Sequence, residues 1–187
     1  MIKNGDDVLF LLLSLPEYAA TTTIVGTIMS NQGLEQALAK LNKKFIRTKV
    51  GDKYVAEALT TNNLPLGGET SGHTIIQKHK PTSDGIFVSL KVLEAVISNN
   101  NWELKTFEAY PQVLLNIPIA NKKDLSAAPF SEIISTYEKK LPTGRILVRY
   151  SGTEKILRVM TEAQSQELAV STAQALAQEL QKALATD

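Results

Sequence analysis

The sequence is 187 residues long, enough for one large or two small domains, and 43% of its residues are hydrophobic. Its 20 basic and 19 acidic side chains leave a net charge of +1. It therefore lacks the strong single-sign field that nucleic-acid-binding and membrane-surface proteins use. No cysteine is present, which excludes disulfide scaffolds, thiolate nucleophiles and Cys-ligated metal sites. We expect a cytoplasmic protein with no nucleic-acid or membrane partner.

The chain opens with a very apolar run, residues 8–13, which is closed by Ser14 and Pro16. The run is shorter than the ~20 residues needed to span a bilayer. Asp6 and Asp7 directly precede it, which disfavours a signal peptide. We interpret it as a buried helix end or strand. Almost nothing precedes it to pack against, so the sequence alone suggests an exposed apolar edge.

Residues 21–97 alternate between strand and helix patterns. Strands are predicted over 21–29, 45–50, 64–69 and 74–77, and helices over 34–41, 53–59 and 86–97. The last of these helices carries one apolar stripe, formed by Ile86, Leu90, Leu93 and Ile97. Such alternation is expected of an α/β domain with helices packed on a sheet.

The polar run 98–101 interrupts this pattern and suggests a domain boundary. Beyond it, strands are predicted over 112–119, 145–149 and 156–160, and helices over 131–140 and 167–184. Strands and helices are segregated here. The second half is therefore predicted to be a small α+β domain.

The first candidate site is the glycine-rich segment 67–74. Its paired glycines permit unusual torsions and close approach of a ligand. Glu69, Ser71 and His73 offer a carboxylate, a hydroxyl and an imidazole, a set that suits sugar hydroxyls better than a triphosphate. The glycine spacing mimics a P-loop, but His73 stands where that motif requires lysine. A hairpin with merely solvated polar residues is an equally weighted alternative.

The second candidate is the segment 149–154, Arg-Tyr-Ser-Gly-Thr-Glu, with Arg158 further on. Successive backbone N–H groups in such a turn, together with two hydroxyls, can form an anion-binding nest. Arg149 at its entry adds bidentate recognition of phosphate. A third segment, 49–55, forms a strand–turn–helix corner, where Asp52 is first of all predicted to be a helix N-cap.

Together these segments resemble the α-D-phosphohexomutase superfamily, and most closely its bacterial phosphoglucosamine mutase branch. Residues 68–73 look like the sugar-binding loop of the family's third domain, and residues 149–154 like the phosphate-binding loop of its fourth. Residues 50–55 are similar to the Val-Gly-Asp-Arg-Tyr-Val corner of the glucosamine branch, with Lys53 in place of arginine. Segments 27–33 and 84–85 also agree in order and spacing.

The departures from the family pattern concern one residue of the phosphate loop and two missing motifs. Lys155 replaces the proline that usually follows that loop, and neither the phosphoserine loop nor the magnesium loop occurs in this sequence. The resemblance thus implies the C-terminal half of a mutase. It implies a remnant of a preceding domain over 1–17, a three-layer α/β/α sugar-binding domain over 18–100, and an α+β phosphate-binding domain with an antiparallel sheet and helices on one face over 101–187.

The resemblance also implies binding roles for individual residues. Sugar-binding positions would be Glu69, Ser71, His73, Asp52 and Lys53. Phosphate-binding positions would be Arg149, Ser151, Gly152, Thr153 and Arg158. It implies no catalytic residue and no metal ligand in this half, with Mg²⁺ bound elsewhere in the intact enzyme.

For the intact enzyme the resemblance implies conversion of glucosamine 6-phosphate to glucosamine 1-phosphate, through a phosphoserine and a bisphosphorylated sugar. The implied partners are a phosphorylated hexosamine or hexose and the missing N-terminal domains, and a homodimer is left open. The alternatives are the corresponding part of a phosphomannomutase or phosphoglucomutase, an autonomous phosphosugar-binding module, and a structural domain whose loops have degenerated.

Overall fold

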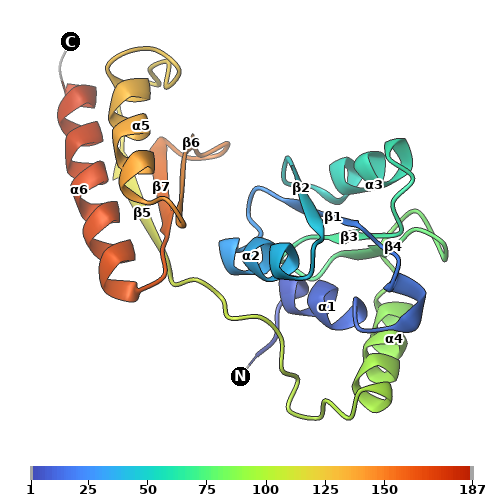
Figure 1. The fold of residues 1–187 in the computed structure, drawn as a ribbon. Coiled ribbons are helices and arrows are strands. Elements are labelled where there is room, and N and C mark those ends of the chain that lie inside the picture. Colours follow the sequence, from blue (N-terminus) through green and yellow to red (C-terminus); the bar gives the residue numbers. More distant parts are fainter. Residues whose placement is uncertain (1, 186–187) are drawn as a thin grey trace. The chain divides into compact units, whose positions relative to one another are not determined.

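The computed structural model describes residues 2–185, which form two compact units that divide between Ala109 and Tyr110 (Figure 1). The sequence placed this division at 100/101. In the structure the polar asparagine run instead ends a helix: Asn99 is its C-cap, and the Asn99 side chain donates to the carbonyl oxygen of Ala95 at 2.9 Å. No described helix is both long and apolar enough to cross a membrane.

The first unit is built on a four-stranded mixed sheet in the order β2-β1-β3-β4. Its strands are β1 (Thr23–Thr27), β2 (Lys44–Thr48), β3 (Leu66–Gly68) and β4 (Thr74–Ile76). β1 runs parallel to β2 and β3, while β4 is antiparallel to β3. The parallel strands are joined by helical crossovers, as their direction requires.

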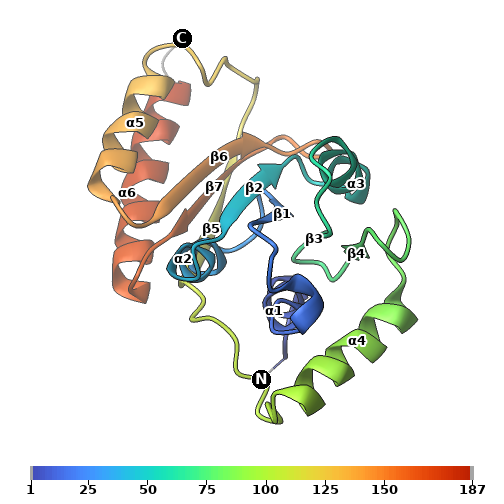
Figure 2. The ribbon, with the colours of Figure 1, turned by 45° about the vertical axis from the view of Figure 1, so that its right-hand side comes forward.

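Helices cover both faces of this sheet, as the sequence predicted. They are α1 (Gly5–Leu12), the short η1 (Pro16–Tyr18), α2 (Gln32–Lys40), α3 (Asp52–Thr61) and α4 (Gly85–Ser98). On one face, Val55 and Leu59 of α3 pack with Val25 and Ile75. The opposite face is covered by α1, α2 and α4 (Figure 2). The unit is therefore a three-layer α/β/α domain.

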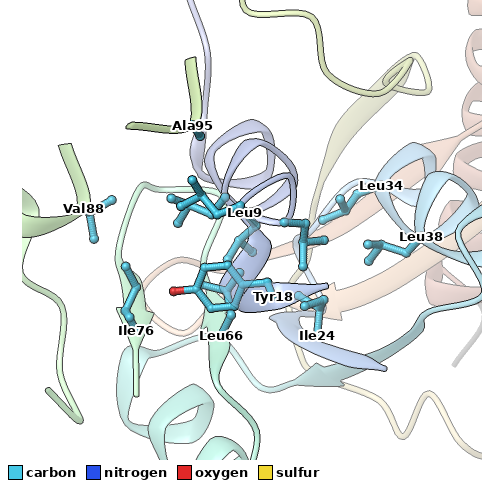
Figure 3. Close-up of a cluster of buried hydrophobic side chains, with 12 residues drawn as sticks. Leu9, Tyr18, Ile24, Leu34, Leu38, Leu66, Ile76, Val88 and Ala95 are labelled. Carbon is cyan, nitrogen blue, oxygen red and sulfur yellow. The ribbon is translucent and has the colours of Figure 1, made fainter. Parts of the chain in front are cut away.

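The apolar N-terminal run is the middle of this second helical layer. Leu9 and Leu12 of α1 are fully buried and pack in one cluster with Ile24 and Leu66 of the sheet (Figure 3). The interpretation of this run as a buried helix end is confirmed, and the cover comes from the face of the sheet, so the apolar edge is not left exposed. The assignment of residues 1–17 to a preceding domain stays a prediction.

Helix α4 lies where the sequence predicts it but turns a different face inward. Ile86 is 80% exposed and Leu90 61% exposed, and Leu93 and Ile97 of the same stripe are also exposed. The buried positions are Val88, Ala95 and Val96. Because α4 is apolar on two faces, periodicity could not choose between them. The smaller side chains face α1 and β4, where the helix packs closely.

The second unit is a three-stranded antiparallel sheet in the order β5-β7-β6, with two helices on one face. Its elements are β5 (Gln112–Pro118), α5 (Phe130–Lys140), β6 (Arg145–Tyr150), β7 (Ile156–Glu162) and α6 (Gln166–Ala185). The helix predicted over 167–184 is confirmed as α6, and its apolar positions Ala169, Ala173, Leu176 and Leu180 are fully buried. This is the predicted small α+β domain.

Candidate functional site

Three loops of the first unit begin where its three parallel strands end. Residues 28–31 follow β1, residues 49–51 follow β2, and residues 69–73 follow β3. Because β1, β2 and β3 run in the same direction, these loops leave the same edge of the sheet. Open α/β sheets bind ligands at this edge. The topology therefore places the predicted sugar-binding loop where a ligand site is expected.

The loop 69–73 is a tight turn between β3 and β4. The Glu69 N–H donates to the His73 carbonyl oxygen, and the Gly72 N–H donates to the Glu69 carbonyl oxygen, both at 2.9 Å. Gly72 has a φ of +105°, a conformation that only glycine adopts without strain. The turn leaves Ser71 and His73 exposed, with the Ser71 Oγ 3.2 Å from His73 Nδ1. Both polar side chains are thus available to a ligand.

Glu69 is buried, unlike Ser71 and His73 of the same loop. It is only 9% exposed, and its Oε1 accepts a hydrogen bond of 2.9 Å from the Gly51 N–H. The structure thus brings the sugar-loop residues and the 51–53 corner together, as the sequence implied. Through this hydrogen bond, the Glu69 side chain joins the loop after β3 to the loop after β2.

At the corner itself, the helix cap is one residue earlier than predicted. Gly51, with a φ of +129°, is the N-cap of α3, and Asp52 is the first helical residue. The Asp52 Oδ1 accepts from the Lys53 N–H at 2.7 Å, and the side chain is exposed. The Lys53 Nζ lies 4.8 Å from the centroid of the Tyr54 ring. Such a cation–π contact holds the ammonium near the corner.

Asp6 and Thr70 also belong to this site, although no sequence pattern points to them. Asp6, in the first turn of α1, is fully buried, and its Oδ2 lies 3.1 Å from the hydroxyl of Thr70 in the loop. Burial raises the pKa of Asp6, an effect that hydrogen bonds from Asn31, Ser30 and Thr70 and the charge of Arg47 partly offset. An acidic residue in a first helical turn is ordinary. Sequence reasoning therefore had no reason to select it.

In the second unit, two arginines lie opposite each other on neighbouring strands. Arg149 of β6 pairs in register with Arg158 of β7. Like charges directly opposite in a sheet are destabilising, so an anion at this position would relieve their repulsion. Arg158 is partly neutralised by Glu154, whose Oε2 lies 3.1 Å from the guanidinium. Within residues 2–185, no acidic partner faces Arg149.

The turn that follows Arg149 is organised by Ser151. This side chain is 2% exposed, and its Oγ lies 3.4 Å from the Thr153 nitrogen and 3.3 Å from the Glu154 nitrogen. These long bonds orient two successive N–H groups around one hydroxyl. Gly152, between Ser151 and Thr153, has open space where a side chain would be. Ser151, Gly152, Thr153 and both arginines are therefore close in this unit, as the resemblance implied.

Lys122 is a cation beside this turn that sequence reasoning missed. Its Nζ lies 3.4 Å from the Ser151 carbonyl oxygen and 5.7 Å from the centroid of the Tyr150 ring. The Tyr150 hydroxyl donates to the carbonyl oxygen of Lys123 and accepts from its N–H, which fixes the loop after β5 beside the turn. The adjacent lysines at 122 and 123 were the available signal. The arginines and Lys122 together make the surface around the turn positive.

The described part of the chain contains no group of three or more His, Asp or Glu side chains that could hold a metal ion. Its two candidate loops offer hydroxyl, imidazole, amide and cationic groups. These groups suit a polyhydroxylated and phosphorylated ligand.

Both units match family models in the expected order. The model for the α/β/α domain III of phosphoglucomutase/phosphomannomutase matches residues 4–111, and the model for the C-terminal domain of the same proteins matches residues 114–179. The chain belongs to the phosphoglucomutase/phosphomannomutase family. Each candidate loop lies within the matched part of its own domain.

Similar sequences within this family are phosphoglucosamine mutases. The chain is 43% identical over 174 residues to that of Lactobacillus johnsonii, covering 89% of this chain and 39% of the relative. It is 40% identical over 186 residues to that of Haemophilus influenzae, covering 96% of this chain and 42% of the relative. The chain therefore spans about two fifths of the length of these relatives.

Solved structures of the family share the fold at lower identity. N-acetylphosphoglucosamine mutase of Aspergillus fumigatus, solved in complex with GlcNAc-6P and magnesium, has a TM-score of 0.75 at 20% identity, covering 95% of this chain and 46% of that one. A phosphoglucomutase/phosphomannomutase family protein of Burkholderia thailandensis has a TM-score of 0.72 at 16% identity, covering 100% of this chain and 43% of that one.

Proposed function

We propose that this chain is the substrate-binding C-terminal part of a phosphoglucosamine mutase. In the intact enzyme, glucosamine 6-phosphate would be converted to glucosamine 1-phosphate through a phosphoserine and a bisphosphorylated sugar. The observation that carries the proposal is the presence, in family order, of two loops: one has exposed hydroxyl and imidazole groups, and the other is flanked by Arg149 and by the partly neutralised Arg158. The similarity to phosphoglucosamine mutases favours the amino sugar.

In the first unit, the sugar would bind at the loop 69–73. The exposed Ser71 hydroxyl and His73 imidazole can each donate or accept a hydrogen bond, as the hydroxyls of a hexose require. Glu69 would accept from a sugar hydroxyl while its Oε1 remains bonded to Gly51. Lys53 and Asp52, at the neighbouring corner, would contribute polar contacts at the edge of the sugar.

In the second unit, the phosphate would bind at the turn 151–153. Arg149 would supply paired N–H donors to two phosphate oxygens, and the Thr153 hydroxyl would add a further donor. Arg158 would contribute mainly charge, because Glu154 already engages its guanidinium. These contacts hold the substrate for phosphoryl transfer without breaking or forming a bond.

The groups that transfer the phosphoryl group would lie in the remaining part of the intact enzyme. A phosphoserine and Mg²⁺ would act there, the metal stabilising negative charge on the transferring phosphate. The described residues do not fit a magnesium site, since they contain no suitable acidic cluster. We expect the chain alone to bind substrate without turning it over. A cytoplasmic location stays a prediction.

The proposal is tested by titrating ¹⁵N-labelled protein with glucosamine 6-phosphate. We expect amide shifts at residues 69–73 and 149–154, weak affinity, and no production of glucosamine 1-phosphate. Shifts confined to other residues would overturn the site assignment. Turnover by the purified chain would overturn the claim that its catalytic groups lie elsewhere.

Two alternative functions predict different observations. Tighter binding of mannose 6-phosphate or glucose 6-phosphate than of glucosamine 6-phosphate would favour the corresponding part of a phosphomannomutase or phosphoglucomutase. A reading frame immediately upstream that encodes the phosphoserine and magnesium loops would count against an autonomous phosphosugar-binding module.

A further inference from the structure

The first turn of α1 lies against the loop 69–73, although 64 residues separate Asp6 from Thr70 in the sequence. The Asp6 carboxylate is fully buried. Its Oδ2 accepts a hydrogen bond of 2.8 Å from the Asn31 N–H and one of 3.1 Å from the Thr70 hydroxyl. One side chain thus joins α1 to the loop after β1 and to the loop after β3.

Gly5, the residue before Asp6, makes a second and independent contact with the same loop. Its N–H donates to the Thr70 carbonyl oxygen at 3.0 Å. A Cβ atom on Gly5 would lie 1.9 Å from the Glu69 carbonyl oxygen and 2.9 Å from the Gly72 nitrogen. Backbone is therefore packed directly on backbone. Any side chain at position 5 would displace either the helix or the loop.

Burial of the Asp6 carboxylate has an unfavourable desolvation free energy, so it is not explained by stability alone. Removing a charge from water is unfavourable, and apolar replacements of buried ion pairs are often neutral or stabilising. The same layer of the first unit is otherwise packed with leucines such as Leu9 and Leu12. A group whose hydrogen bonds run to two loops of a candidate site is better explained by the geometry it imposes than by the stability it adds.

We propose that Gly5 and Asp6 are positioning residues for the sugar-binding loop. They hold the backbone and hydroxyl of Thr70, and thereby keep the adjacent Ser71 and His73 in the arrangement that receives the sugar of a hexosamine phosphate. Their action is indirect, since each contacts the loop and neither is offered as a contact of the ligand. The identity of the ligand rests on the proposed function, whereas the contacts by which Gly5 and Asp6 hold the loop do not.

Asp7 provides a matched control in the same helical turn. Its carboxylate accepts from the Asn4 N–H at 3.0 Å, lies 3.4 Å from the Lys3 ammonium and accepts from the Thr106 hydroxyl. It stabilises the start of α1 without touching the loop 69–73. Asp7→Ala therefore reports the effect of weakening α1, and Asp6→Ala reports that effect together with loss of the loop contact.

The experiment measures three quantities for the whole chain and its variants. They are the dissociation constant of glucosamine 6-phosphate, the dissociation constant of inorganic phosphate, and the hydrogen-exchange rate of the Gly72 amide without ligand. For Asp6→Ala and Thr70→Val we expect glucosamine 6-phosphate to bind about tenfold more weakly, the scale of one hydrogen bond to a charged group. Phosphate affinity, which reports the second unit, should be unchanged. Gly72 exchange should accelerate by a similar factor.

Further variants make the test independent of folding failures. Asp6→Asn keeps an oxygen acceptor for Asn31 and Thr70 and should restore most of the sugar-phosphate affinity. The double variant Asp6→Ala/Thr70→Val should bind more strongly than the sum of the two single losses predicts, because both changes break the Asp6–Thr70 bond; the 3.3 Å contact of the Thr70 hydroxyl with the Met29 carbonyl oxygen is the further loss from Thr70→Val. Gly5→Ala should accelerate Gly72 exchange without altering any charge.

Two results would overturn the proposal. One is an equal loss of sugar-phosphate affinity in Asp6→Ala and Asp7→Ala, and the other is unchanged Gly72 exchange in every Asp6 and Thr70 variant. If the unaltered chain binds phosphate but not glucosamine 6-phosphate, the proposed function fails. The exchange rates alone then decide whether Gly5 and Asp6 support the loop.

Discussion

The two candidate loops are held in different ways. The loop 69–73 depends on contacts from two other segments: Gly51 bonds to Glu69, and in the first turn of α1 Asp6 bonds to Thr70 while Gly5 packs against the loop backbone. The turn 151–154 is held mainly by residues within and next to it, through the Ser151 hydroxyl and the β6–β7 register. The first loop is therefore a product of the tertiary fold and the second mostly of a hairpin.

The loops also differ in their electrostatics, and the difference matches the proposed ligand groups. At the first loop the carboxyl groups of Glu69 and Asp6 are buried and hydrogen-bonded, so the loop itself exposes a hydroxyl and an imidazole. Around the second, Arg158 pairs with the Glu154 carboxylate, whereas Arg149 and Lys122 make no salt bridge within residues 2–185. Hydroxyl recognition requires geometry, whereas phosphate recognition can rely on charge.

The largest expected effect comes from weakening the helix that supports the first loop. Leu12 is fully buried between α1 and the sheet, so Leu12→Ala should lower the free energy of unfolding of the first unit by about 2–5 kcal/mol. Chemical denaturation measures this loss. In the second unit, Leu114 is 46% exposed, so Leu114→Ala should change stability by less than ~0.5 kcal/mol. Equal effects of the two variants would contradict the described burial.

The next largest effect is expected at the turn 151–154, where phosphate recognition relies on charge. Arg149→Ala should weaken phosphate binding by about 1.5–3 kcal/mol, the scale of a charged hydrogen-bonded contact, and isothermal titration would measure it. Lys139→Ala, which removes an exposed cation from α5, controls for net charge and should leave affinity unchanged. The assignment of Arg149 is refuted if its variant titrates like the unaltered protein.

A third prediction uses the buried carboxylate of the first unit. Because the pKa of Asp6 is raised in the folded state, the folded protein holds its proton more tightly than the unfolded chain. The stability from this group is complete below the unfolded pKa of about 3.8 and is lost as the pH rises through the folded pKa.

The stability of Asp6→Asn should therefore fall less than that of the unaltered protein as the pH rises from 4 towards neutrality. Denaturation curves across this range measure the difference, in which titration of all other groups cancels. Parallel pH profiles for the two proteins would show that Asp6 titrates as an ordinary exposed carboxyl.

The smallest effect concerns the ion pair between Glu154 and Arg158. Glu154 is 60% exposed, so Glu154→Gln should change the free energy of unfolding by less than ~1 kcal/mol. Phosphate affinity should rise roughly twofold, because the guanidinium is freed and one negative charge is removed. A loss of phosphate affinity would instead mean that Glu154 orients Arg158 for binding.

The sequence alone predicted most of the secondary structure and both loops. Alternation of apolar residues identified the strands, and Ala169, Ala173, Leu176 and Leu180 identified the buried face of α6 because that helix has one apolar stripe. The loops were recognisable because glycine, hydroxyl and charged residues are contiguous within them. Such contiguous patterns can be recognised from the sequence without knowledge of the fold.

Only the tertiary structure decided which apolar surfaces are covered. The run 8–13 had no visible partner in the sequence, and the sheet that buries Leu9 and Leu12 is assembled from strands beginning at Thr23. The stripe Ile86–Ile97 looked like a core face, but α4 is apolar on two faces and packing chose the one with smaller side chains. The periodicity of apolar residues shows that a helix face is apolar, but it does not show which element packs against that face.

The same reason explains why Asp6 was missed. Its importance lies in a hydrogen bond to Thr70 across 64 residues of sequence, which exists because α1 packs beside β3. The sequence determined the chemistry that each loop can offer, since that depends on residue identity. The structure determined which residues hold the first loop in place, because long-range contacts depend on how the layers pack.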